Sequence, residues 1–230
     1  MTSRLSELAG CTATADEFFP TGIARNRAGS SPELQIADKE RCDGDSSLGL
    51  QLACLLQQVE SATNHAKRLV LGRSDHKLTV RVRTGSWSVT ECLEHLALTT
   101  RVFLPPIAEI MAVTPRLTRN RPLHCDAVAR VLIHMLEPPY RLRHKVLAHL
   151  APQRNDFPCV WKAFLESQEQ LAEITRSAVG LAIDTVKIQS PVCSRVSYSV
   201  YGALGILSAH QRRHLWQMEQ VLQSLDRRAS

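Results

Sequence analysis

The sequence predicts an all-α fold: a four-helix bundle with a long crossover between its second and third helices. Three observations lead to this prediction. Four long segments repeat apolar residues at three- and four-residue steps, which is typical of amphipathic helices. No segment shows a convincing strand pattern of alternating apolar and polar residues. One connection is much longer than a turn between antiparallel neighbouring helices requires.

The first predicted helix spans about residues 46–71. Leu52, Leu55 and Val59 lie at helical spacing on one face, and Gly72 is a suitable stop. The preceding residues, 1–44, are rich in Gly, Ser, Thr, Asp and Arg, so we expect a loosely ordered extension there. The bundle domain is therefore expected to span residues 45–228.

The second predicted helix begins after Ser88, in the sequence SVTE. This sequence is typical of a capping box, in which the Ser88 side chain accepts a hydrogen bond from the Glu91 amide and Glu91 reaches back to the Ser88 amide. Trp87 precedes the cap and can pack on the first turn. Pro105 and Pro106 are expected to break or kink the helix, with helical pattern resuming as far as about residue 112.

The crossover spans residues 114–157 and includes a short helical segment at about 127–136. The third predicted helix runs from about residue 158 to 179, with a proline near its start and Gly180 past its end. The fourth runs from about residue 199 to 225.

Charge and cysteine content narrow the classes of partner. The net charge is +6, but the basic residues are spread along the chain without a dense run, so nucleic acid is an unfavoured partner. The seven cysteines form no CxxC pair. No segment has the roughly 18 uninterrupted apolar residues of a membrane span, and no signal-like run follows the start. We expect a cytoplasmic protein with no membrane partner.

The sequence HQRRH places His210 and His214 four residues apart, on one side of the fourth predicted helix. Leu207 on the same face indicates that both rings point inward, while Arg212 and Arg213 are expected to turn toward solvent. Such a pair also occurs by chance in helices that bind no metal. Two buried imidazoles nevertheless need polar partners, and a shared cation would satisfy their lone pairs.

His95 lies two turns past Ser88 and becomes a third ligand if the second and fourth helices face each other. A lone helical histidine is more often structural, so both interpretations stay open at this point. Gln217, Trp87 and Glu91 are the residues that we expect to orient the rings or to line the pocket. Zinc suits three nitrogen ligands best, and nickel, iron and manganese are alternatives.

Two motifs together resemble the DinB/YfiT-like superfamily. One is W-S-x-x-E-x-x-x-H, from Trp87 to His95, and the other is A-H-x-x-R-H-x-x-Q, from Ala209 to Gln217. The resemblance extends over about residues 46–226. It implies a four-helix bundle in which His95, His210 and His214 bind a divalent metal.

The resemblance also implies a reaction class. Members with known activity are similar to metal-dependent transferases and isomerases that use low-molecular-weight thiols such as bacillithiol, mycothiol or glutathione. We therefore expect a thiol transferase-like enzyme acting on a small-molecule substrate. The alternative is a non-enzymatic, metal-stabilised bundle that acts in a stress response or binds a partner. A homodimer is plausible for bundles of this kind.

Further candidates for the pocket are polar or aromatic residues that lie outside the two motifs. They are His65, His124, His134, His144, His149, Trp161, Tyr198, Tyr201, Arg141 and Arg143.

Overall fold

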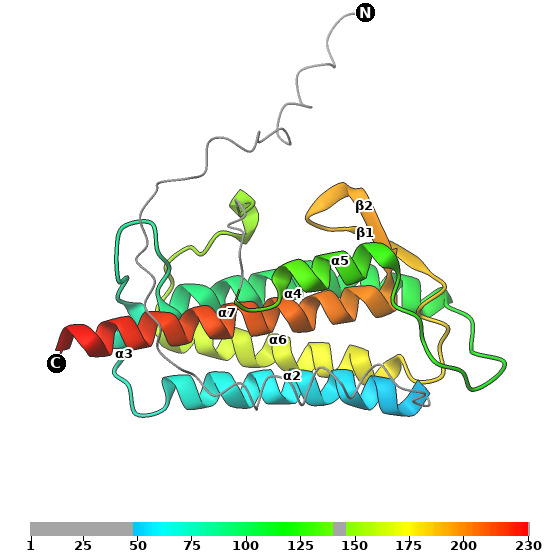
Figure 1. Cartoon of the computed structure of the whole chain (residues 1–230), viewed down its shortest axis with the longest axis horizontal. Coiled ribbons are helices and arrows are strands. Elements are labelled where there is room, and N and C mark those ends of the chain that lie inside the picture. Colours follow the sequence, from blue (N-terminus) through cyan, green and yellow to red (C-terminus); the bar gives the residue numbers. More distant parts are fainter. Residues whose placement is uncertain (1–47, 140–145, 230) are drawn as a thin grey trace, which may run out of the picture. The chain divides into compact units, whose positions relative to one another are not determined.

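The structure is a computed structural model that describes residues 48–139 and 146–229. Four long helices lie side by side (Figure 1). They are α2 (Leu48–Val70), α4 (Val89–Val113), α6 (Phe157–Ser177) and α7 (Val200–Ala229). Helices α2 and α4 each contact both α6 and α7. The prediction of a mainly helical fold is confirmed, and each predicted long helix is found within a few residues of its expected bounds. The predicted boundary near residue 44 lies outside the described residues, as do Arg141, Arg143 and His144.

Short elements complete the described part of the chain. The helices among them are α3 (Asp75–Thr79), α5 (Ala127–Leu136) and the 3-10 turn η2 (Ala148–Leu150). The strands β1 (Lys187–Ser190) and β2 (Cys193–Ser199) form an antiparallel pair. The expectation that the chain has no strands is therefore wrong. The sequence signal was weak because β1 is only four residues long, and its core contact, Ile188 opposite Tyr198, appears only once the strands are paired.

A break or a kink was expected at Pro105 and Pro106; helix α4 continues through both residues, so there is no break. A proline inside a helix costs roughly 3 kcal/mol because it removes a backbone hydrogen bond and its ring crowds the preceding turn. Burial offsets this cost: Phe103, Leu104 and Ile107 flank the prolines and belong to the hydrophobic core. Packing therefore overrides the local preference.

Among the described helices, α4 alone is long and apolar enough to cross a membrane, with a mean hydropathy of 1.5 over its most apolar window. Its apolar composition has another explanation, because nearly every residue in the first three turns of α4 is buried. Glu91, Glu94 and His95 are among these buried residues. These charged or polar groups contact other parts of the protein. A buried core helix accounts for this composition.

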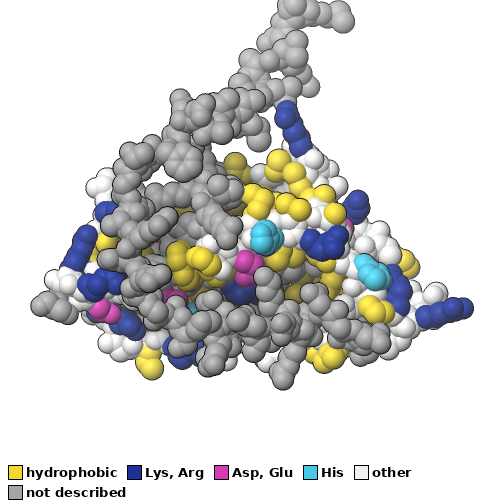
Figure 2. All heavy atoms as spheres, in the orientation of Figure 1, with side chains coloured by type: hydrophobic (Ala, Val, Ile, Leu, Met, Phe, Trp, Pro, Cys, Tyr) yellow, Lys and Arg dark blue, Asp and Glu magenta, His cyan; other side chains and the backbone are white. Residues whose placement is uncertain are grey.

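Lys and Arg side chains lie in several separate places on the face of the molecule seen in Figure 2. Hydrophobic, acidic and uncharged side chains lie among them. The described basic side chains visible in this view do not form one patch.

Candidate metal centre

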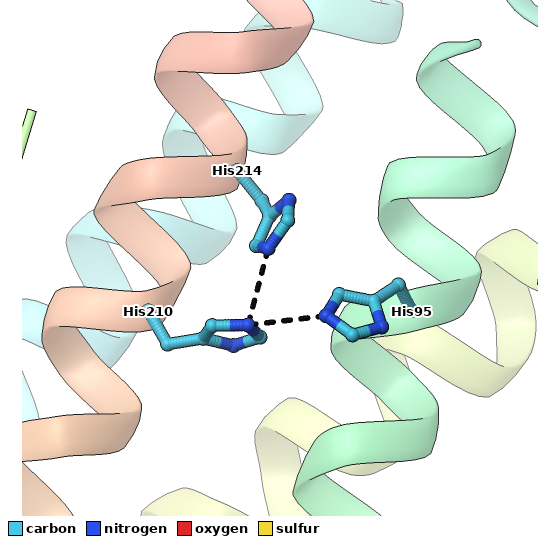
Figure 3. A group of neighbouring side chains, drawn as sticks. All are labelled: His95, His210 and His214. Atoms are coloured by element: carbon cyan, nitrogen blue, oxygen red, sulfur yellow. Dashed lines mark hydrogen bonds between the residues drawn. The ribbon is translucent and has the colours of Figure 1, made fainter. Parts of the chain in front are cut away.

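Three histidine rings from two helices point toward one another (Figure 3). His95 comes from α4, and His210 and His214 come from α7. The Nε2 atom of His210 lies 3.1 Å from Nε2 of His95 and 3.1 Å from Nε2 of His214. One ligand atom from each ring lies within 4.8 Å of the others. The predicted convergence of residues 115 positions apart is therefore present in the fold.

The start of α4 is fixed by the predicted capping box. The Ser88 side chain accepts a hydrogen bond from the Glu91 amide at 3.2 Å, and Glu91 accepts one from the Ser88 amide at 2.9 Å. Trp87, directly before the cap, lies over the site: its ring is 4.9 Å from that of His95 and 5.7 Å from that of His214. The cap thus determines where the tryptophan and the first ring lie.

A backbone carbonyl sets the tautomer of His95. Nδ1 of this ring lies 2.8 Å from the carbonyl oxygen of Leu150, in η2. Because a carbonyl only accepts, the ring hydrogen is on Nδ1, which leaves the lone pair of Nε2 directed at the other two rings. Histidine ligands of metals are commonly oriented by such a hydrogen bond on the second nitrogen.

All three rings are held in the neutral form. His95 and His214 are 5% and 6% exposed, and His210 is partly exposed. Burial lowers the pKa of His95, and it lowers the pKa of His210 and His214 well below the ordinary value. The positive charge of Arg213 lowers all three pKa values further. Neutral imidazole is the form that binds a metal ion.

Hydrogen bonding among the rings cannot satisfy this arrangement. Nε2 of His210 faces two nitrogen atoms but can carry only one hydrogen. Nδ1 of His214 is buried and has no hydrogen-bond partner. Burial lowers the pKa of His214, and a weak hydrogen-bonding interaction with Gln217, too poorly aligned to count as a full hydrogen bond, raises it by less. A cation between the rings would instead accept all three lone pairs.

The spacing suits a tetrahedral metal ion. A Zn–N distance of about 2.0–2.1 Å in tetrahedral geometry separates two ligand nitrogens by roughly 3.4 Å. The two nitrogen contacts of 3.1 Å are close to this value. The three residues present therefore fit a divalent metal, and three protein ligands would leave a further position for another molecule.

The other two predicted site residues have different surroundings. Trp87 packs on the rings, as described, whereas Glu91 is turned away from them toward Arg81, with which it forms a bidentate ion pair. Burial raises the pKa of Glu91, but the hydrogen bonds from Arg81 and Ser88 outweigh it, so the pKa is below its ordinary value. Glu91 also lines a cleft of about 190 Å³, together with Arg154 and Asn155, and none of the three histidines lines it.

The expectation that Arg213 faces solvent is wrong, because this residue is only 7% exposed. Arg212 is partly exposed and binds Glu137 and Gln58. Residues 212 and 213 are 100° apart around α7, so the two side chains can have different surroundings. No local pattern in the sequence distinguishes them, and the buried arginine next to the rings was missed.

Most of the secondary candidates lie away from the rings. His65 pairs with Glu219 at 2.7 Å, and His124, His134 and His149 are exposed. Trp161 stacks with Phe157 and Phe164 in the core. Tyr198 is buried in the hairpin, and Tyr201 lies partly buried against the same core. The Leu150 carbonyl, by contrast, was missed, because a backbone group has no signature in the sequence.

Comparison with known proteins identifies the family. A family model described as the DinB superfamily matches residues 57–218, which include all three histidines. The chain therefore belongs to the DinB superfamily. Neither the curated proteins nor the solved structures gave a match.

Proposed function

We propose that this chain is a DinB-like protein with a four-helix bundle that binds a divalent metal through His95, His210 and His214 and acts as a thiol transferase-like enzyme. The convergence of three neutral ring nitrogens within 4.8 Å, two of them on buried residues, carries the proposal. The metal is zinc, or else nickel, iron or manganese. When bound, the metal acts as a Lewis acid that lowers the pKa of a thiol, so that the thiol is a thiolate at neutral pH.

The residues around the rings favour an anionic ligand. Three neutral imidazoles bring no negative charge, and the Arg213 charge acts on all three. Glu91 does not compensate, because its carboxylate is bound to Arg81. Because three neutral imidazoles leave the charge of a divalent cation uncompensated, a thiolate bound to it would reduce that charge and a neutral ligand would not.

The proposed reaction joins a low-molecular-weight thiol to a small electrophile. A new bond forms between sulfur and the electrophilic carbon, the leaving group departs with its electron pair, and the thiol proton passes to solvent. The chain's own part is to orient the His95 lone pair through the Leu150 carbonyl and to cover two rings with Trp87. Both contacts fix ring positions before any ligand arrives.

Elemental analysis of the purified protein tests the metal site first. We expect about one divalent metal per chain, and its loss in His214→Ala. His134→Ala is the matched control, because His134 is an exposed residue of α5. Bacillithiol, mycothiol and glutathione are then offered with a test electrophile. Conjugation by the metal-loaded wild type and none by His214→Ala is the expected result; normal turnover by that variant overturns the proposal.

The second candidate is a non-enzymatic bundle stabilised by its metal. The converging rings favour it as much as they favour an enzyme, because a cation would take up the Nε2 lone pairs that face one another. Removing the metal with a chelator separates the two. Loss of conjugation with an unchanged circular dichroism spectrum indicates an enzyme, whereas loss of the helical signal indicates a structural metal.

A further inference from the structure

A second cleft lies between α4, α6 and the segment at 151–156. Its volume is about 200 Å³. Ala97, Leu98, Val160 and Ala163 give it an apolar floor, and Glu94, Asn155 and Cys159 add polar groups. We refer to it as the α4–α6 cleft. None of the three metal-site histidines lines it.

Glu94 is the unusual group in this cleft, because its carboxylate is buried without a cation. The residue is 6% exposed. Its Oε1 atom accepts a hydrogen bond from Nδ2 of Asn155 at 2.5 Å, while Oε2 is buried with no hydrogen-bond partner. Over residues 48–139 and 146–229, Glu94 is in none of the ion pairs. Burying a charged group without a partner of opposite charge is unfavourable, so this site favours a positively charged ligand.

We infer that the α4–α6 cleft binds a small primary alkylamine, with the ammonium group at Glu94 and the alkyl chain on the apolar floor. An ammonium donates three hydrogen bonds and neutralises the carboxylate, which an alcohol cannot do. Glu94 lines the cleft, so its carboxylate is within reach of an ammonium group bound there. The volume suits a ligand smaller than a drug-sized molecule, whose pockets measure roughly 300–1,000 Å³.

Among the described residues that line the cleft, Arg101 is the one cation. Its side chain is half exposed, and its guanidinium lies 3.8 Å from the Glu166 carboxylate. Glu94 and Arg101 are two turns apart on α4, about 10 Å along the helix axis. Glu166 partly balances the charge of Arg101.

The inference is independent of the metal. Glu94 and His95 are neighbours in the chain, but their side chains leave α4 about 100° apart. His95 contacts α7 and η2, whereas Glu94 contacts Asn155. Amine binding is therefore expected in protein treated with a chelator, so a failure of the metal site leaves this test intact.

Cys159 serves as the reporter, since it is an exposed free cysteine in the cleft wall. Alkylation by iodoacetamide is followed by mass spectrometry at pH 7.5 with n-butylamine, n-butanol or no addition. We expect n-butylamine to slow alkylation of Cys159 at least fivefold and n-butanol to have little effect. Cys193, a free cysteine in β2, is the internal control and should react at the same rate throughout.

Two variants make the test specific. Glu94→Gln keeps an acceptor for Asn155 but removes the charge, and it should lose the protection by n-butylamine. Ala163→Leu keeps the carboxylate but fills the floor, and it should lose the protection too. Glu109→Gln, an exposed change on the same helix, should behave like wild type. Unprotected Cys159 in the wild type, equal protection by n-butanol, or protection that survives Glu94→Gln overturns the inference.

A further arm identifies the source of the amine. Nα-acetyl-lysine amide carries the same ammonium on a peptide-like group. Stronger protection than with n-butylamine assigns the cleft to a lysine side chain, and weaker protection assigns it to a free amine. Either result supports recognition of an alkylammonium group.

Discussion

The metal-free protein should lose stability as the pH falls below 6.5, because the three rings of the metal site resist protonation in the folded state. Unfolded histidines take up a proton near their ordinary pKa of 6.5. In the folded protein, burial lowers the pKa of all three rings. Lowering the pH therefore stabilises the unfolded chain first, and the free energy of unfolding falls until the pH reaches the folded pKa values.

The size of the effect follows from the number of rings. Each ring that stays neutral in the folded protein lowers the free energy of unfolding by about 1.4 kcal/mol when the pH falls from 7.5 to 5.5. His210 and His214, whose pKa values are lowered furthest, together give roughly 3 kcal/mol. His95 adds up to about 1.4 kcal/mol more. Of a total stability of about 5–15 kcal/mol this is a large share.

Urea unfolding followed by circular dichroism at both pH values, with a chelator present, measures this difference. The chosen range avoids the carboxylates Glu91, Asp126 and Asp184, whose pKa values are lowered from ordinary values of 4.5 or below. His214→Gln should reduce the loss by about 1.4 kcal/mol. His134→Gln, on the exposed face of α5, should leave it unchanged. A wild-type loss below about 1 kcal/mol, or the same loss in His214→Gln, refutes the reasoning.

Three further predictions concern packing. Cobalt or copper should quench tryptophan fluorescence on binding, and Trp87→Phe should lose most of the quenching, because Trp87 lies 4.9 Å from a ligand ring; equal quenching in that variant contradicts the site. Gly202→Ala should destabilise the fold by about 1–3 kcal/mol in urea unfolding, because its Cβ would lie 2.5 Å from that of Ala129. Gly49→Ala, a helical position with open space, should instead be stabilising or neutral and is the control. Phe164→Ala should cost about 3–5 kcal/mol, since the side chain is 1% exposed in the core.

The parts of the fold that the sequence predicted are those set by local signals. Helix α5 has the predicted bounds, and α4 begins at the predicted cap, because Ser88 and Glu91 are neighbours in sequence as well as in space. The hairpin and the unbroken α4 were not predicted, because both depend on packing between distant residues. Pro105 and Pro106 are tolerated only because their neighbours are buried.

The metal site divides in the same way. The pair at His210 and His214 is a local pattern on α7, and the sequence could show that both rings share a face. Whether His95 joins them depends on how α4 is rotated against α7, which no spacing within either helix determines. The structure adds the Leu150 carbonyl, 55 positions away from His95, as the group that fixes this ring.

The cost of this arrangement is itself an argument for a bound cation. Three rings have been moved out of water far enough to lower their pKa values, beside a buried arginine that lowers them further. Nε2 of His210 faces two other Nε2 atoms at once and can donate only one hydrogen. Apolar side chains of similar volume would pack here without these penalties. Three converging imidazoles therefore destabilise a helical core unless they bind something. A divalent cation would offset this cost, because it accepts all three Nε2 lone pairs together.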